Sequence, residues 1–129
     1  MLITPPNHPL ARLNRPVTLA EIARYPLLTY KSTSPVHHLL MEVFAAAGLT
    51  PDIAYALDDE TAIGGMVASG AGLSLCLDVS LLTPFALARV PVADPLPKRV
   101  VYFAFRKNTP KDAAVMALFQ KIEKWPEAA

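Results

Sequence analysis

Residues 26–77 read PLLTYKSTSPVHHLLMEVFAAAGLTPDIAYALDDETAIGGMVASGAGLSLCL, and short apolar runs alternate in them with helix-forming segments. The order is strand 26–30, helix 35–47, strand 52–57, helix 60–69 and strand 73–77. This alternation is typical of an α/β fold, in which helices flank a parallel sheet. Ligands of such sheets bind at the loops that follow the carboxyl ends of the strands. The loops after the three apolar runs therefore form the candidate site.

Local signals set the helix boundaries. Thr18 and Glu21 form a capping box that opens a short helix before the first run. Ser34 is a good N-cap for the next helix, because proline follows it at the first helical position. Gly48 ends that helix. We therefore expect both helices to be fixed by their own sequence.

The pattern also indicates which segments are buried. The strand at 73–77 is continuously apolar, which is typical of a central strand covered on both faces. The strand at 52–57 alternates and is expected nearer a sheet edge. The helix at 60–69 is expected to turn four side chains inward, namely Ala62, Ile63, Met66 and Val67.

The flanking segments extend the same fold. A strand is expected at 2–4, followed by a proline-rich connector up to residue 16. Two more strands are expected at 87–92 and 99–105. Asp112 then caps a last helix. Its apolar residues recur at helical spacing: Val115, Leu118, Phe119, Ile122 and Trp125.

Composition excludes several classes of protein. The net charge is +1, from 12 basic and 11 acidic residues, so no basic face indicates nucleic-acid binding by this chain. The single cysteine, Cys76, cannot form an intrachain disulfide, which favours a reducing, cytoplasmic location. Between residues 61 and 88 the one charged residue is Asp78, but glycines break that run into pieces too short to span a membrane.

Six segments, in the same order along the chain, resemble the effector-binding domain of LysR-type transcriptional regulators. They are HPLA at 8–11, TLAEIA at 18–23, PLLTY at 26–30, FAAAGLTP at 44–51, VASGAGLSL at 67–75 and YFAFRK at 102–107. The resemblance covers nearly the whole chain and concerns the C-terminal part of that domain. It implies a mixed, mainly parallel sheet flanked by helices, like one subdomain of a type II periplasmic-binding-protein fold.

The resemblance also implies a domain organisation. Residues 1–17 correspond to a crossover strand and linker from a missing first subdomain. Residues 18–107 correspond to the second effector subdomain. Residues 108–129 correspond to a C-terminal helix that would pack on the missing subdomain. We therefore expect a truncated, non-enzymatic module that senses a small molecule and lacks the DNA-binding domain.

In the family a small organic effector, frequently an anion, lies between the subdomains. Mapped onto this sequence, the implied contacts are Tyr30, Lys31, Ser32, Thr33 and Ser34 from the first loop, Asp58 and Asp59 from the second, and Leu77, Asp78 and Val79 from the third. A helix N-terminus beside Lys31 is a reasonable anion site, because it presents unpaired N–H donors. The alternative is that Ser34 and the acidic loop simply cap their helices.

Other kinds of site find less support. His37 and His38 are adjacent, so on a helix they point about 100° apart and cannot share one metal ion. No cofactor is expected. Two alternatives stay open: a fragment of a transport solute-binding protein, and a small enzyme that uses Asp58 with Asp59 or Glu60, or uses Cys76.

The missing half of the domain has consequences for binding and assembly. We expect the chain to bind its effector weakly, because one wall of the cleft is absent. Apolar surface is expected on the last helix, from Val115 to Trp125, and beside the strand at Leu2. A second copy is expected to cover it, giving a homodimer or a larger oligomer. No contact with membrane or nucleic acid is expected.

Overall fold

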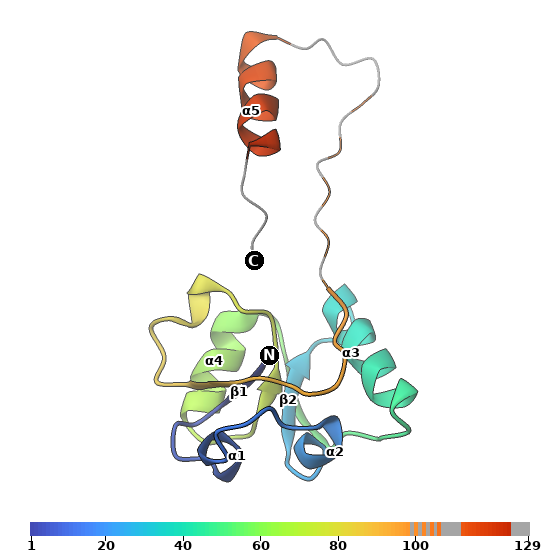
Figure 1. Ribbon diagram of the computed structural model, residues 1–129, viewed down its shortest axis with the longest axis vertical. Helices are drawn as coiled ribbons and strands as arrows, with labels where there is room; N and C mark the ends of the chain where they lie inside the picture. Colours follow the sequence, from blue (N-terminus) through green and yellow to red (C-terminus); the bar gives the residue numbers. More distant parts are fainter. Residues whose placement is uncertain (99, 101, 103, 105, 107–111, 125–129) are drawn as a thin grey trace. The chain divides into compact units, whose positions relative to one another are not determined.

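A computed structural model of the chain describes residues 1–98, 100, 102, 104, 106 and 112–124. The chain divides into two compact units, Met1–Lys98 and Arg99–Ala129. The first unit contains, in order, β1 (Leu2–Thr4), α1 (Pro9–Arg12), α2 (Leu19–Ile22), β2 (Leu27–Tyr30), α3 (Pro35–Ala46), β3 (Ile53–Leu57), α4 (Glu60–Ala68), β4 (Ser74–Leu75), the 3-10 helix η1 (Ser80–Leu82) and β5 (Ala88–Val90) (Figure 1). The second unit contains α5 (Ala113–Glu123).

The strands of the first unit lie in the order β3-β2-β4-β1-β5. β2 pairs with β3 in parallel, and β1 lies between β4 and β5, antiparallel to both. The N–H of Leu28 donates to the carbonyl of Leu73 at 2.7 Å, and the N–H of Leu73 donates to the carbonyl of Pro26 at 3.0 Å. This parallel bridge joins β2 to β4. All strands but β1 therefore run in one direction, which confirms the mixed, mainly parallel sheet.

The sheet is covered on both faces. On one face α1, α2 and α3 enclose a core that includes Leu2, Ile22, Leu27 and Phe44. On the other, α4 and η1 cover a second core that includes Ile63 and the buried thiol of Cys76. Residues 73–76 are all buried, so the central position of the third run is confirmed. β3 is the edge strand, as expected, and its Tyr55 is 55% exposed.

The inward face of α4 differs from the prediction at one position. Ile63 and Val67 are fully buried as expected, but Ala62 is exposed. The buried stripe instead passes through Gly64, where an added Cβ would lie 2.9 Å from side-chain atoms of Leu82 and Phe85. The helix is thus rotated so that its glycine lets η1 approach closely, and this places Ala62 at the flank.

The predicted proline-rich connector contains α1, which the sequence analysis missed. Pro9 occupies the first turn, and the Nδ1 atom of His8 accepts from the N–H of Leu10 at 3.2 Å. Acceptance at Nδ1 requires a neutral imidazole, and burial lowers the pKa of His8. Leu10 is buried, so this short helix contributes to the core.

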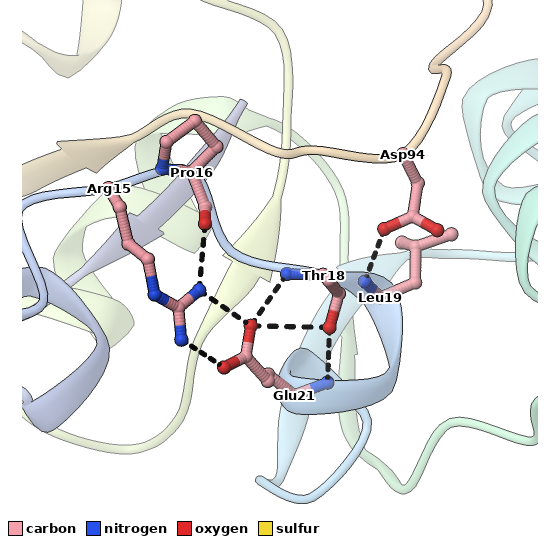
Figure 2. Close-up of polar contacts among 6 residues, drawn as sticks. All are labelled: Arg15, Pro16, Thr18, Leu19, Glu21 and Asp94. Atoms are coloured by element: carbon pink, nitrogen blue, oxygen red, sulfur yellow. Dashed lines mark hydrogen bonds and ion pairs between the residues drawn. The ribbon is translucent and has the colours of Figure 1, made fainter.

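The capping box predicted for α2 is present (Figure 2). The Thr18 hydroxyl accepts from the N–H of Glu21 at 3.2 Å, and the Glu21 carboxylate accepts from the N–H of Thr18 at 2.8 Å. Arg15 adds an ion pair to Glu21 at 2.7 Å. The hydrogen bond from Arg15, followed by that from the Thr18 N–H, lowers the pKa of Glu21 to about 2.

A distant residue completes this cap. The Asp94 carboxylate accepts from the N–H of Leu19 at 2.8 Å, across 75 positions of sequence (Figure 2). Next to it, the N–H of Ala93 donates to the carbonyl of Val17 at 2.8 Å. These bonds attach the segment that follows β5 to the start of α2.

α5 begins where the sequence predicts, because the Asp112 carboxylate accepts from the N–H of Val115 at 2.8 Å. None of its side chains is buried, and Leu118 and Ile122 are 49% and 38% exposed. The predicted contribution of Trp125 lies outside the described residues, as does most of the predicted strand at 99–105.

The expectation of apolar surface at Leu2 is wrong, because β1 is paired on both sides and Leu2 is fully buried.

Candidate ligand-binding site

The first two predicted loops meet at the carboxyl ends of β2 and β3. The N–H of Lys31 donates to the carbonyl of Leu57 at 2.9 Å, which extends the pairing of the two strands by one bond. The Lys31 ammonium then forms an ion pair with Asp58 at 2.7 Å. Both side chains are more than half exposed, so the pair adds little stability and a ligand can compete for either partner.

The first loop presents free hydroxyls beside a helix start. Ser34 is the N-cap of α3, and its hydroxyl accepts from the N–H of Val36 at 3.2 Å. Its N–H donates to the carbonyl of Lys31 at 2.8 Å, which closes the turn. Ser32 and Thr33 are exposed, and their hydroxyls have no hydrogen-bond partner within the described ranges 1–98, 100, 102, 104, 106 and 112–124. Ser34 therefore caps the helix, whereas Ser32 and Thr33 are available to a ligand.

The carboxylates of the second loop have structural partners. Asp59 is the N-cap of α4 and accepts from the N–H of Ala62 at 2.9 Å. Asp58 is paired with Lys31. Helix capping thus explains the position of the Asp59 carboxylate. The Asp58 carboxylate instead pairs with Lys31, and this pair forms because β2 and β3 are neighbours.

The side chain of Tyr30 points away from the first loop, into the core under α4. It is 3% exposed, and its hydroxyl donates to Glu60 at 3.2 Å. Burial raises the pKa of Tyr30 far above its ordinary value, while a backbone hydrogen bond from Leu77 acts in the opposite direction. The carbonyl of Tyr30 faces Nδ1 of His37 at 2.8 Å. Tyr30 thereby connects the strand end to the starts of α3 and α4 and to the third loop, a role that the sequence analysis did not identify.

The third loop follows β4. Asp78 forms an ion pair with Arg89 of β5 at 3.5 Å, and Val79 precedes η1 without a side-chain cap. Leu77 and Asp78 line a cavity of about 150 Å³. The third loop therefore borders a cavity that the residues predicted from the first two loops do not line.

The alternatives involving Cys76 and metal ions gain no support from the geometry. The thiol of Cys76 is 6% exposed, and burial raises its pKa to about 12, so it is a poor nucleophile near neutral pH. The rings of His37 and His38 lie edge to face, with centroids 5.4 Å apart. In the part of the chain that the structure describes, no three His, Cys, Asp or Glu residues gather as metal ligands would. No helix there is long and apolar enough to cross a membrane.

Known proteins resemble the chain in sequence and in structure. It is 35% identical over 78 residues to the HTH-type transcriptional regulator CysB of Burkholderia cenocepacia, a match that covers 60% of this chain and 25% of that protein. The effector-binding domain of QuiR in complex with shikimate superposes with a TM-score of 0.78 and 26% identity, over 92% of this chain and 56% of that one. The BenM effector-binding domain with its effector benzoate has a TM-score of 0.69 at 22% identity, over 96% and 57% of the two chains, and shows the fold alone.

The chain thus spans about a quarter of the curated relative and somewhat more than half of the solved domains. The family model described as the LysR substrate binding domain matches residues 1–126. The chain belongs to the LysR substrate-binding domain family, which is a family of ligand-binding domains of regulators and not of enzymes.

Proposed function

We propose that the chain is the small-molecule-sensing part of a LysR-type transcriptional regulator, and that it binds a small organic anion at the loop from Lys31 to Ser34. The observation that carries the proposal is the arrangement of that loop. Two free hydroxyls, Ser32 and Thr33, lie between a lysine and the N-terminus of a 12-residue helix. Helix N-termini favour anions through their unpaired N–H groups and their dipole.

The ligand class follows from this chemistry and is supported by one solved neighbour. The effector-binding domain of QuiR is in complex with shikimate, which is a ring carboxylate. A carboxylate accepts several hydrogen bonds at once, which suits two hydroxyls and the backbone N–H groups beside them. We therefore assign a small organic carboxylate to the first loop. Contacts from Asp58, Asp59, Leu77, Asp78 and Val79 stay predictions.

The proposed mechanism is non-catalytic. Effector binding changes the relative placement of two subdomains, and this alters the spacing of the DNA-binding domains in the oligomer. The division into a crossover segment at 1–17, an effector subdomain at 18–107 and a C-terminal helix at 108–129 is part of the same proposal, as is a cytoplasmic location. Each carboxylate that the enzyme alternative would use is engaged, since Asp58 pairs with Lys31, Asp59 caps α4 and Glu60 accepts from Tyr30.

Thermal unfolding in the presence of carboxylates tests the proposal. Because a single wall of a cleft binds weakly, we expect a millimolar dissociation constant for benzoate or shikimate. At ten times that concentration the ligand adds about 1.4 kcal/mol to the free energy of unfolding. This corresponds to a rise in Tm of about 5 °C. The double variant Ser32→Ala/Thr33→Ala should lose most of the rise.

Ser69→Ala is the matched control. Its hydroxyl donates to the carbonyl of Met66 at 2.8 Å, at the opposite end of α4 from the site. This variant should keep the full ligand-induced rise in Tm. The assignment fails if neither carboxylate raises the Tm of the unaltered chain, or if the double variant responds as strongly as the control.

We also propose self-association through α5. Its apolar residues Val115, Leu118 and Ile122 form a stripe at helical spacing, and Leu118 is about half exposed at 49%. A second copy of the chain would supply an equal stripe, so an antiparallel pair of α5 helices would cover both. Gln120 lies on the opposite face of α5, so the pair would keep a polar side facing solvent.

A further inference from the structure

A cavity of about 220 Å³ lies at the end of the sheet opposite to the loop at 31–34. β2 begins after Pro26, β4 begins after Leu73, and the antiparallel β1 ends before Pro5, so these three strand ends meet at one edge. The wall consists of Pro5, His8, Tyr25, Pro26, Gly70, Ala71, Gly72 and Leu73. None of these residues belongs to the loops predicted to hold the effector.

Two hydrogen-bond donors in this wall have no partner in the part of the chain that the structure describes. The Nδ1 atom of His8 accepts from the N–H of Leu10, so the neutral ring carries its proton on Nε2, and Nε2 makes no hydrogen bond there. The N–H of Gly72 is also unpaired, whereas that of Leu73 donates to the carbonyl of Pro26 at 3.0 Å. The cavity therefore offers free donors to a ligand.

The wall is uncharged and suits a flat molecule. It contains no Asp, Glu, Lys or Arg, and burial lowers the pKa of His8, so its ring stays neutral at neutral pH. The rings of His8 and Tyr25 lie edge to face, with centroids 4.6 Å apart. A Cβ added at Gly70 would meet nothing within 4 Å, so a ring has room beside this turn. An ion would leave water here without a countercharge, which is costly.

The volume of the cavity sets the size of the ligand. A cavity of about 150 Å³ holds benzene, so a larger one of about 220 Å³ has room for two fused rings. We propose that this cavity binds an uncharged, flat heteroaromatic molecule of two fused rings, whose ring nitrogen accepts a hydrogen bond from the N–H of Gly72 or from Nε2 of His8. Contact with Tyr25, Leu73 and the two prolines removes the apolar surface of the rings from water.

Benzimidazole and indole are the matched probes, and amide NMR of the intact chain is the measurement. Both are uncharged at neutral pH and carry one ring N–H, but benzimidazole also has a ring-nitrogen acceptor. Benzimidazole is expected to bind with a dissociation constant on the order of 1 mM. It should give saturable shifts at the amides of residues 70–72, largest at Gly72. Indole should bind at least about tenfold more weakly, because it leaves the donors unpaired.

Variants test the position of the site. Pro5→Trp adds a two-ring side chain to the wall and should weaken the binding of benzimidazole at least about tenfold. Pro6→Trp changes the next residue, which is exposed and outside the wall, and should leave binding unchanged. His8→Ser keeps an oxygen that can cap α1 but removes the ring and its donor, so it should also weaken binding.

The double variant Ser32→Ala/Thr33→Ala should bind benzimidazole as the original chain does, so this site and the anion loop can fail independently. Circular dichroism checks that each variant is folded. If Pro5→Trp does not fold, His8→Ser and the comparison with indole still decide. The proposal is overturned if benzimidazole gives no saturable shifts at residues 70–72, if indole binds as tightly, or if folded Pro5→Trp binds benzimidazole as well as Pro6→Trp does.

Discussion

Thr29 shows how a single residue can lie in a fold without a hydrogen-bond partner. It is 2% exposed, and its hydroxyl is the buried side-chain group that lacks a partner among the described residues. The void that it lines, of about 10 Å³, is at the lower limit for one water molecule, and its other walls are Leu, Met, Phe and Ile side chains. A water molecule in this void would have too few hydrogen-bond partners. Burial therefore removes the Thr29 hydroxyl from water without giving it a new hydrogen bond.

Thr29→Val should therefore stabilise the chain. The change keeps the shape of the side chain and removes the desolvated hydroxyl, which costs about 1–3 kcal/mol when it is left unpaired. We expect the free energy of unfolding in urea to rise by about 1 kcal/mol. Thr29→Ser is the control, since it keeps the hydroxyl and enlarges the void, and it should lower stability. A valine variant less stable than the original chain would show that the hydroxyl has a partner after all.

Hydrogen bonds between residues that are close in the sequence were predictable. The caps at Thr18, Ser34, Asp59 and Asp112 each bond an N–H two or three residues away, so the local sequence contains both partners. Contacts between distant segments were not predictable in this way. The Lys31–Asp58 ion pair and the bond from Tyr30 to Glu60 form because β2 and β3 are neighbours and α4 starts beside them.

At the scale of elements, α2 illustrates how a short helix is held. Four residues are too few for a stable isolated helix, because nucleation is unfavourable. Its capping box, its ion pair with Arg15 and the bond from its first turn to Asp94 compensate (Figure 2). The sequence predicts the capping box, but nothing local to α2 indicates Asp94, which lies 75 positions from Leu19.

This network predicts a dependence of stability on pH. The pKa of Glu21 is lowered in the folded chain to about 2 from an ordinary value of 4.5. A carboxylate whose pKa is lowered by folding stabilises the folded chain. This stabilisation is complete at pH values above the ordinary pKa and is lost as the pH falls through the pKa of the folded chain. The difference in stability between the original chain and Glu21→Gln should therefore be constant above pH 5 and shrink toward pH 2. Urea unfolding across this range measures it.

Glu42→Gln is the control for that series, because Glu42 is an exposed residue of α3 far from Arg15 in sequence. The difference in the free energy of unfolding between Glu42→Gln and the original chain should show no comparable decline between pH 5 and pH 2. If Glu21→Gln behaves like Glu42→Gln, the hydrogen bonds from Arg15 and Thr18 do not hold the Glu21 carboxylate in solution.

The order of the elements was partly predictable. The alternation of strand and helix predicts the parallel neighbours at Leu27, Ile53 and Leu73, since a helical crossover returns the chain in the same direction. The insertion of β1 between β4 and β5 has no local signal, because its partners lie more than 70 residues away. α1 was missed because prolines were interpreted as a connector, although proline is compatible with a first helical turn.

At the scale of the whole molecule, assembly is the first question. With 53% hydrophobic residues and an α5 helix that buries none of its side chains, the chain is expected to self-associate. Light scattering at micromolar concentration should give at least twice the mass of 14.0 kDa. Leu118→Glu/Ile122→Glu should restore the monomer, and Gln120→Glu, which adds charge on the opposite face of α5, should not. A monomeric original chain would contradict the proposal.

We propose that the loops at the carboxyl ends of β2 and β3 bind a small organic anion. The most direct measurement is an amide NMR titration of the chain with benzoate and shikimate, each at up to tens of millimolar. We expect saturable shifts that are largest at residues 31–34 and extend to Asp58, the ion-pair partner of Lys31. Shifts that fail to saturate there, or that concentrate at the opposite end of the sheet around Gly70–Gly72, would contradict it.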